Sequence, residues 1–286
     1  MDQLPPPARV SDLCAYPVKS LRGRSVPWMA VEPWGLAGDR RWMIVDPVNR
    51  FLTQREVPAM ATIQADWLED GIRLARVGAA DAIVVPTPGA GAETLAATVW
   101  GDTVPVRAAG EEAAAWLGAA LGRPCRLVYM ADPTVRPVDP RHAAPGDRTA
   151  LNDGFPVLLV TTGSLATLNA HLARPIPVTR FRPNIVVEGA APWEEETWRR
   201  VRIGGVVFRV AKPCARCVVT TIDQETGEKP DPSEPLRTLN RIRRDAREGV
   251  MFGQNLIPES PGRIAVGDAV EVLAVGPRNV DLVPPP

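Results

Sequence analysis

Proline and glycine are so frequent in this chain that they limit the length of any regular element. The 286 residues include 31 prolines and 23 glycines. Proline is disfavoured inside helices and central strands, and glycine commonly marks a turn. The chain is therefore divided into short segments, most of which are rich in β-branched residues and bounded by turn residues. This pattern predicts a mainly β fold with a few helices.

The predicted elements of the first half are short strands, one hairpin and one helix. The sequence D-P-V-N at positions 46–49 lies between two apolar runs and predicts a hairpin turn. Residues 111–121 predict a helix, because the segment begins with two glutamates and ends before Gly122. The predicted strands span residues 10–16, 41–45, 63–68, 82–85, 94–100 and 125–130.

A polar, proline-rich stretch over residues 131–152 separates the two halves. Its composition fits a domain boundary and a long surface loop equally well, and the sequence leaves both open. Beyond it, strands are predicted at 156–160, 184–187, 199–203, 206–211 and 218–223, with a closing strand in G-D-A-V-E-V-L and helices over 162–172 and 235–244. The whole pattern predicts an α+β, mainly β architecture, most simply a β-barrel with a smaller β-domain.

Charge and hydropathy exclude several classes of function. The formal net charge is zero and the pI is about 6.8, which argues against a general nucleic-acid binder. No stretch approaches the roughly 20 apolar residues that span a bilayer. The N-terminus lacks the basic start and apolar run of a signal peptide, so we expect no membrane span and a cytoplasmic location. The two histidines, His142 and His171, are too few for a histidine-rich zinc site or a Ser/His/Asp triad.

The stretch A-K-P-C-A-R-C-V-V-T-T-I-D, residues 211–223, holds two of the four cysteines, Cys214 and Cys217. A structural zinc site usually needs four Cys or His ligands, and the other cysteines and histidines lie in unrelated contexts. A redox C-x-x-C pair normally begins a helix, whereas a β-like run follows Cys217. A single activated thiolate fits better, because Lys212 and Arg216 favour the deprotonated form. On this interpretation Cys217 opens a strand as the ligand, and Cys214 is a small buried residue.

A lone soft thiolate suits a transition metal whose other ligands come from an organic cofactor. Basic residues that would suit an anionic cofactor occur in three stretches: Y-P-V-K-S-L-R-G with Lys19 and Ser20, G-L-A-G-D-R-R-W with Arg40, and T-R-F-R-P-N with Arg180 and Arg182. Converging Lys and Arg side chains would give a phosphate or a pterin charge-assisted hydrogen bonds. Each stretch alone is more simply a solvated surface charge, and spacing alone does not bring the three together.

Together and in this order, these motifs resemble the MOSC family, the molybdenum cofactor sulfurase C-terminal domains, and in particular its amidoxime-reducing branch. The resemblance also includes F-L-T-Q-R-E-V-P, K-P-C-A-R-C-V-V-T-T-I-D, M-F-G-Q-N-L and G-R-I-A-V-G-D-A-V-E-V-L, and extends from about residue 10 to residue 273. It implies an N-terminal β-barrel-like domain over 8–130, a connecting loop over 131–152 and a β-barrel MOSC domain over 153–275. The two domains would be intertwined, with the cofactor in the cleft between them.

The resemblance also implies roles for individual residues. Cys217 would be the protein thiolate bound to molybdenum and the catalytic residue. The residues implied to bind the molybdenum cofactor (molybdopterin) are Lys19, Ser20, Arg40, Asp153, Gly154, Arg182, Asn184, Ala215, Arg216 and Cys217. Further residues match family-like segments but receive no role from the resemblance, namely Thr53, Arg55, Gln254 and Asn255.

The implied activity is the reduction of N-hydroxylated substrates, such as amidoximes and hydroxylamines, by oxygen abstraction at a Cys-ligated molybdenum. No cysteine follows Cys217 to hold an iron–sulfur cluster, so electrons are expected from a separate ferredoxin-like or flavin-reductase protein. Two alternatives stay open on sequence. The chain would be a non-catalytic cofactor carrier or sulfur-transfer protein if Cys217 holds the cofactor or a persulfide without turnover. It would be a thiol–disulfide protein if both Cys214 and Cys217 are needed.

Overall fold

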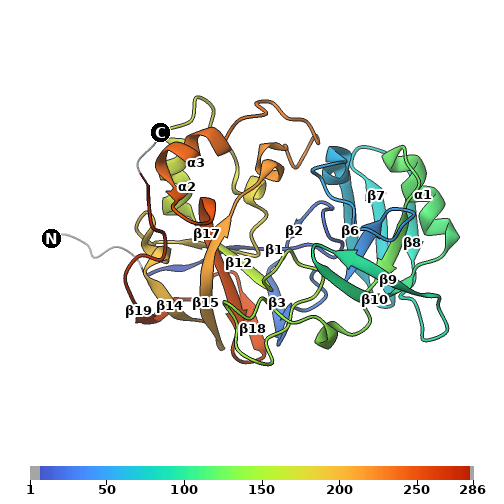
Figure 1. Ribbon diagram of the computed structural model, residues 1–286, viewed down its shortest axis with the longest axis horizontal. Coiled ribbons are helices and arrows are strands. Elements are labelled where there is room, and N and C mark those ends of the chain that lie inside the picture. Colours follow the sequence, from blue (N-terminus) through green and yellow to red (C-terminus); the bar gives the residue numbers. More distant parts are fainter. Residues whose placement is uncertain (1–6, 284–286) are drawn as a thin grey trace.

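The computed structural model describes residues 7–283, and its fold is mainly β with three α-helices in that range (Figure 1). The first half contains β1 (Arg9–Ala15), β2 (Arg24–Ser25), β3 (Trp28–Glu32), β4 (Gly35–Leu36), β5 (Trp42–Val45), β6 (Ile63–Leu68), β7 (Gly71–Arg76), β8 (Ala82–Val85), β9 (Thr94–Val99), β10 (Asp102–Ala108), α1 (Glu111–Leu121) and β11 (Arg126–Tyr129). The second half contains β12 (Val157–Thr161), α2 (Thr162–Asn169), β13 (Ile185–Glu188), β14 (Trp198–Ile203), β15 (Val206–Ala215), α3 (Leu236–Ile242), β16 (Arg244–Asp245), β17 (Gly249–Pro258), β18 (Gly262–Ala265) and β19 (Val270–Val275). Short 3₁₀ turns connect them: η1 (Pro58–Thr62), η2 (Pro133–Val135), η3 (Val178–Phe181), η4 (Glu194–Glu196) and η5 (Val218–Thr221).

The strands form one large sheet and three smaller ones. The large sheet has the order β19-β14-β15-β17-β12-β13-β1-β2, with β16 paired to β17 off this path. Its strands pair antiparallel, except that β12 and β13 are parallel. The smaller sheets have the orders β5-β11-β10-β9, β18-β3-β4 and β6-β7-β8. The mainly β class with a few helices, predicted from the short segments, is confirmed.

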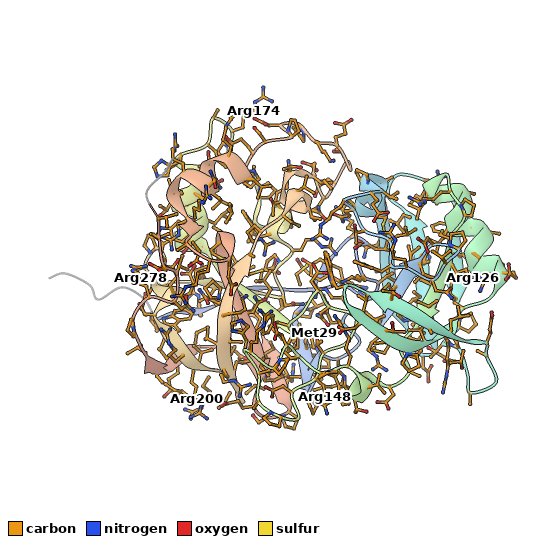
Figure 2. All side chains as sticks on the ribbon, viewed as in Figure 1. Met29, Arg126, Arg148, Arg174, Arg200 and Arg278 are labelled. Atoms are coloured by element: carbon orange, nitrogen blue, oxygen red, sulfur yellow. The ribbon has the colours of Figure 1, made fainter. Side chains whose placement is uncertain are left out.

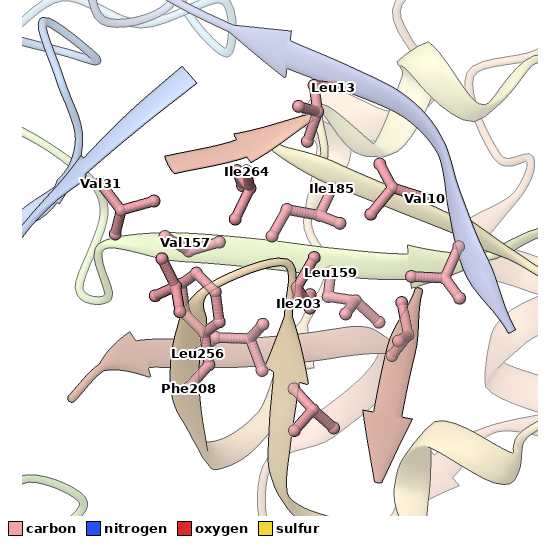
Figure 3. Close-up of a cluster of buried hydrophobic side chains, with 14 of the residues drawn as sticks. Val10, Leu13, Val31, Val157, Leu159, Ile185, Ile203, Phe208, Leu256 and Ile264 are labelled. Atoms are coloured by element: carbon pink, nitrogen blue, oxygen red, sulfur yellow. The ribbon is translucent and has the colours of Figure 1, made fainter. Parts of the chain in front are cut away.

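The N-terminal strands belong to the sheets of the C-terminal half. Strand β1 pairs antiparallel with β13, and β3 pairs antiparallel with β18. The core follows this exchange, and Figure 3 shows the shared side chains, among them Val10, Leu13, Val31, Val157, Leu159, Ile185 and Ile264. The intertwined architecture is therefore built by long-range pairing. The predicted domain bounds, residues 8–130 and 153–275 with a connecting loop over 131–152, stay a prediction.

A second compact body is built around the sheet β5-β11-β10-β9. All four side chains of β5 are buried, and they alternate between two cores. Trp42 and Ile44 pack into the core beneath α1, whereas Met43 and Val45 pack against β9 and β10. Successive side chains of a strand point to opposite faces of the sheet. A strand that is buried on both faces therefore has a continuous run of apolar residues. The turn after β9 and the hairpin after β5 then carry Trp100 and Arg55 toward the second half.

Local patterns predicted many elements well. Helix α1 and strands β6 and β8 have the predicted bounds, and the hairpin at 46–49 is confirmed by antiparallel pairing of Val45 with Phe51. Helix α2 ends at Asn169, earlier than the predicted residue 172. Several strands had not been predicted, namely β2, β3, β4, β7, β10, β16, β17 and β18. Among residues 7–283, no helix is long and apolar enough to cross a membrane.

The prediction of a strand over residues 218–223 was wrong, because the segment after Cys217 begins with the 3₁₀ turn η5. The β-branched run V-V-T-T favoured a strand on propensity. Its threonine hydroxyls instead donate to carbonyl oxygens three residues back. Thr220 Oγ1 lies 2.9 Å from the oxygen of Cys217, and Thr221 Oγ1 lies 2.8 Å from that of Val218. These local bonds compete with strand formation and close the turn.

Gly253 accounts for the M-F-G-Q-N motif inside β17. Its φ is +81°, and a Cβ atom there would lie 2.7 Å from the carbonyl oxygen of Leu159 and 2.9 Å from Cγ2 of Val160. A left-handed non-glycine residue costs about 1–3 kcal/mol. The clash adds to this cost because β12 is held between β13 and β17. We expect Gly253→Ala to lower the free energy of unfolding by about 2–4 kcal/mol.

Denaturant-induced unfolding measures this effect, with Gly249→Ala as the matched control. Gly249 lies in the same strand at φ +91°, but no other atom comes within 4 Å of its would-be Cβ. The control therefore carries the backbone cost without the clash. Equal losses of stability in the two variants would show that the close approach to β12 contributes nothing.

Candidate functional site

A cavity of about 300 Å³ lies where segments from the two halves of the chain meet. The segments after β1, β4, β5 and β9 contribute lining residues from the first half, and the segments before β12 and β13 and around the end of β15 contribute those from the second half. The structure brings together in this lining every residue that the resemblance implied for the cofactor: Lys19, Ser20, Arg40, Asp153, Gly154, Arg182, Asn184, Ala215, Arg216 and Cys217. Residues that lie up to about two hundred positions apart in the sequence thus share one small space.

The cavity concentrates positive charge in a chain whose net charge is zero. Figure 2 shows that some arginines, among them Arg126, Arg174 and Arg200, lie at the outside of the molecule. The cavity, in contrast, is lined by six cationic side chains: Lys19, Arg40, Arg55, Arg182, Lys212 and Arg216. Asp153 is the one acidic residue in the lining. Clustered charge of one sign in a concave site raises the local concentration of oppositely charged ligands.

Three of these cations have carboxylate partners. Lys19 bonds Asp153, Arg40 bonds Asp39, and Lys212 bonds Glu248. The other three, Arg55, Arg182 and Arg216, make no ion pair among the described residues.

Two buried nitrogens of the lining lack any hydrogen-bond partner within residues 7–283. They are Nη2 of Arg182 and Nε of Arg216. Buried polar atoms are nearly always hydrogen-bonded in folded proteins, because leaving one unpaired costs about 1–3 kcal/mol. Two unpaired guanidinium nitrogens in one cavity are donors available to an anion.

The backbone around the cavity is held in unfavourable conformations. Six non-glycine residues in the described chain have positive φ, and four of them line the cavity. These are Ser20 (67°), Arg40 (48°), Trp100 (56°) and Arg182 (54°). Such conformations cost about 1–3 kcal/mol each and cluster at functional sites. The fold therefore positions these side chains at a cost in stability.

Tyr16 joins the arginines of the two walls. The guanidinium carbons of Arg40 and Arg182 each lie 4.3 Å from the centroid of its ring. Asn184 also links the two halves of the chain. Its Oδ1 accepts a hydrogen bond from Arg40 Nη1 at 3.2 Å, and its Nδ2 donates to the backbone oxygen of Cys14. Burial lowers the pKa of Arg182. Burial acts in the same direction on Arg40, but the Asp39 carboxylate outweighs it and raises the pKa of Arg40.

Cys217 contacts a residue that the sequence left without a role. Arg55 Nη2 donates to Cys217 Sγ at 3.2 Å, and the guanidinium carbon of Arg55 lies 4.4 Å from the Trp100 ring centroid. Trp100 Nε1 in turn donates to Asp153 Oδ1 at 3.2 Å. The F-L-T-Q-R-E motif had marked Arg55, whereas no motif pointed to Trp100. The Arg55–Cys217 contact joins side chains from the two halves of the chain.

The interpretation of Cys214 as a small buried residue was wrong. Its side chain is half-buried, lines the cavity, and accepts a hydrogen bond from Arg216 Nη1 at 2.9 Å. Both Cys214 and Cys217 are free thiols. No group of three or more His, Cys, Asp or Glu side chains in the described range could hold a metal ion. A metal at Cys217 would therefore need ligands beyond those that the described side chains supply.

The remaining predicted residues lie in different places. Thr53 and Asn255 line the cavity, whereas Gln254 is buried and exchanges hydrogen bonds with Asn279. His142 lies outside the lining, with Nε2 3.8 Å from Glu248, and His171 is exposed and lines a different cavity. Neither histidine reaches Cys217.

Comparison with known proteins covers nearly the whole chain. Residues 7–124 match the MOSC N-terminal beta barrel domain, and residues 146–271 match the MOSC domain. Mitochondrial amidoxime-reducing component 1 of Mus musculus is 34% identical over 280 residues, covering 92% of this chain and 82% of the relative. The protein of that name in Homo sapiens is also 34% identical, with the same coverage. A molybdenum cofactor sulfurase of Anopheles gambiae is 34% identical over 82% of this chain and 32% of its own length.

Proposed function

The chain belongs to the MOSC family and is related to the amidoxime-reducing components, and on this premise we propose that it is a molybdenum-cofactor-dependent reductase of N-hydroxylated compounds. The substrate class is amidoximes and hydroxylamines. An amidoxime takes up two electrons and two protons, its N–O bond breaks, and an amidine and water leave. The electrons come from a separate donor protein, ferredoxin-like or a flavin reductase. The observation that carries the proposal is a half-buried thiol in a cavity lined by six cations.

The donor set of the cavity fits this cofactor. Cys217 offers one soft sulfur ligand, which is suited to a transition metal whose other ligands come from the cofactor. The unpaired nitrogens of Arg182 and Arg216 offer charge-assisted hydrogen bonds to its anionic part. When bound, the cofactor supplies the oxygen abstraction and the two-electron chemistry, and the protein binds, orients and neutralises it.

Lys19 should make anion binding depend on pH. Its side chain is 4% exposed, and burial lowers the pKa of Lys19 from 10.5 to about 8, although Asp153 acts in the opposite direction. In the unfolded chain this lysine keeps its proton up to about pH 10.5. The folded protein therefore gains stability between pH 8 and 10.5, because deprotonation removes the desolvation cost of the buried ammonium group. Over the same window the cavity loses one of its cations.

We expect the affinity of the cofactor-free protein for phenyl phosphate to fall by up to about tenfold per pH unit above pH 8. The probe is a dianion throughout this window, because the second pKa of a phosphate ester is about 6. Titration calorimetry from pH 7.5 to 10 measures the affinity. A Lys19→Arg variant stays charged and should show a flat profile. The same fall in Lys19→Arg would assign the pH dependence to another group.

Arg55 is proposed as a positioning residue for the thiolate. It donates to Cys217 Sγ at 3.2 Å and is itself held against the Trp100 ring. Groups that hydrogen-bond a metal ligand typically contribute about 10–100-fold to metal affinity or activity. We expect Arg55→Leu to lower both kcat and retained molybdenum by such a factor with little change in KM, and Arg55→Lys to restore part of the loss.

The matched control for Arg55 is Arg50→Leu. Arg50 lies in the same hairpin segment, half exposed, and pairs with Glu56 rather than with the cavity. It should leave kcat and molybdenum content unchanged. Unaltered kinetics and metal content in Arg55→Leu would remove Arg55 from the account while leaving the role of Cys217 intact.

Benzamidoxime reduction tests the proposed function directly. The purified, cofactor-loaded protein is given chemically reduced methyl viologen as an artificial electron donor under anaerobic conditions. We expect oxidation of two equivalents of viologen per benzamidine formed, with the amidine identified by chromatography. A protein that contains molybdenum but forms no benzamidine from benzamidoxime, and no amine from an N-hydroxylamine, would instead support the alternative of a cofactor carrier or sulfur-transfer protein.

A further inference from the structure

A second cavity, of about 980 Å³, lies in the C-terminal half and is larger than the one beside Cys217. Its walls are the chain that follows α2, residues 171–176, and the loop and helix of residues 230–241, together with Arg180. Helices α2 and α3 lie near each other on the same side of the molecule in Figure 1. The two cavities share no lining residue, so this space is separate from the proposed cofactor site.

The acidic side chains of this second cavity are already engaged. Asp231 Oδ1 accepts from the backbone nitrogen and hydroxyl of Ser233 at 2.9 and 2.7 Å. Glu234 accepts from Arg237 Nε at 2.8 Å and from the backbone nitrogen of Thr238 at 3.1 Å. Both carboxylates thus stabilise the turn that begins α3, and a cationic ligand would find no free carboxylate among them.

In this cavity Arg241 has no counter-charge within the described part of the chain, and Arg180 keeps one unpaired nitrogen. Arg180 has a side chain only 7% exposed, and its Nε has no hydrogen-bond partner among the described residues. Its other two nitrogens donate to the oxygen of Thr221 at 2.7 Å and to Asp223 at 3.2 Å. Arg241, in the last turn of α3, makes no ion pair within residues 7–283. Arg174 also lines the cavity, but its side chain extends away from the molecule in Figure 2.

Part of the lining is apolar. It includes Leu172, Pro175, Ile176 and Pro230. Leu172 and Ile176 also pack against the small core formed by Leu168, Phe181 and Phe252, so this wall is fixed. Binding sites for small molecules typically have about 300–1,000 Å³ and combine an apolar lining with a few placed polar groups. The second cavity has a volume in this range and one apolar wall, and its other walls are polar and charged.

We propose that this second cavity binds a small organic anion with an apolar body, such as an aryl carboxylate or sulfonate. The apolar walls take the body, and the unpaired charge of Arg241, together with the unpaired Nε of Arg180, takes the anionic group. Arg180 also holds the carbonyl of Thr221 at the end of η5, the turn that starts at Cys217. It is therefore left unchanged in the test, because its replacement would disturb both cavities.

Two dyes of the same shape test the charge requirement. 8-Anilinonaphthalene-1-sulfonate carries a sulfonate, and N-phenyl-1-naphthylamine is its uncharged counterpart. In fluorescence titrations of the full-length, cofactor-loaded protein, we expect saturable one-to-one binding of the sulfonate. The uncharged dye should bind at least about tenfold more weakly, since one charge-assisted interaction is lost.

Three variants locate the binding. Arg241→Glu should weaken sulfonate binding by about tenfold or more. Asn240→Trp should block the cavity, because Asn240 is half-buried on α3 and lines the space. Arg244→Glu is the matched control, since it makes the same charge reversal on an exposed side chain outside the lining. This control should bind the sulfonate like the wild type.

Several results would overturn the proposal. They are an absence of saturable binding, equal affinity for the two dyes, wild-type affinity in either Arg241→Glu or Asn240→Trp, and equal weakening in Arg244→Glu. The thermal midpoint of each variant is measured alongside, and if Arg241→Glu is destabilised, Arg241→Gln replaces it.

Discussion

Replacing Cys217 with serine should abolish amidoxime reduction and strip the protein of molybdenum. The serine hydroxyl is a hard and weakly acidic group that poorly replaces a soft thiolate toward this metal. Loss of groups that only support a metal ligand costs about 10–100-fold, so loss of the ligand itself should exceed about 100-fold in turnover. The readouts are benzamidine formation and metal content per chain. Fold is checked by thermal denaturation, which should change little because the side chain is half-buried.

Cys214→Ser is the matched control for Cys217. Cys214 lies three residues earlier, is also half-buried and also lines the cavity, but its hydrogen bond comes from Arg216 rather than Arg55. We expect it to keep its metal and most of its turnover. Equal loss of activity in both serine variants, together with a reversible disulfide between the two thiols, would favour the thiol–disulfide alternative.

Arg182→Gln should separate cofactor binding from stability. The substitution removes the positive charge that burial disfavours and a nitrogen, Nη2, that has no partner in the described chain. It also removes the stacking of the guanidinium on Tyr16 and the hydrogen bond to Gln224. Removal of the buried charge should stabilise the fold, whereas loss of the stacking and of the hydrogen bond should destabilise it. We expect the first effect to equal or exceed the second, so the thermal midpoint of the cofactor-free protein should stay the same or rise. Cofactor content should nevertheless fall by at least about tenfold, because one charge-assisted contact is lost.

The contrast between stability and binding is what identifies a functional arginine. Arg202→Gln is the control, because Arg202 is exposed on β14 and pairs with Glu271. It should change neither quantity. A large fall in the thermal midpoint of Arg182→Gln, with cofactor content lost only in proportion to unfolded protein, would show that Arg182 serves the fold rather than the ligand.

Elements that depend on local chemistry could be predicted from the sequence. Helix α1 begins with two glutamates and ends at Gly122, whose φ of 67° suits glycine, so its bounds are encoded within the segment. Strand pairing across the chain could not be predicted. Nothing within β1 indicates that Val10 will pair with Val187, because antiparallel register depends on which apolar faces meet in the folded core.

The candidate site, too, could be predicted only in part from the sequence. The resemblance to a known family predicted that the motifs containing Lys19, Arg40 and Cys217 form one site. Charge and sequence spacing alone could not predict that these motifs lie together. The contact between Arg55 and Cys217 joins residues 162 positions apart, and Trp100 supports it from a turn with no motif of its own. The turn η5 was missed because side-chain hydrogen bonds of Thr220 and Thr221 outweighed their strand propensity.

The central claim is that the cationic cavity holds a molybdenum cofactor through Cys217. Elemental mass spectrometry of the wild-type protein, purified from a host that makes the cofactor, tests it most directly. We expect close to one molybdenum per chain, which is lost in Cys217→Ser and retained in Cys214→Ser. Molybdenum at background level in the wild type, from a host shown to load another molybdoenzyme, would contradict it.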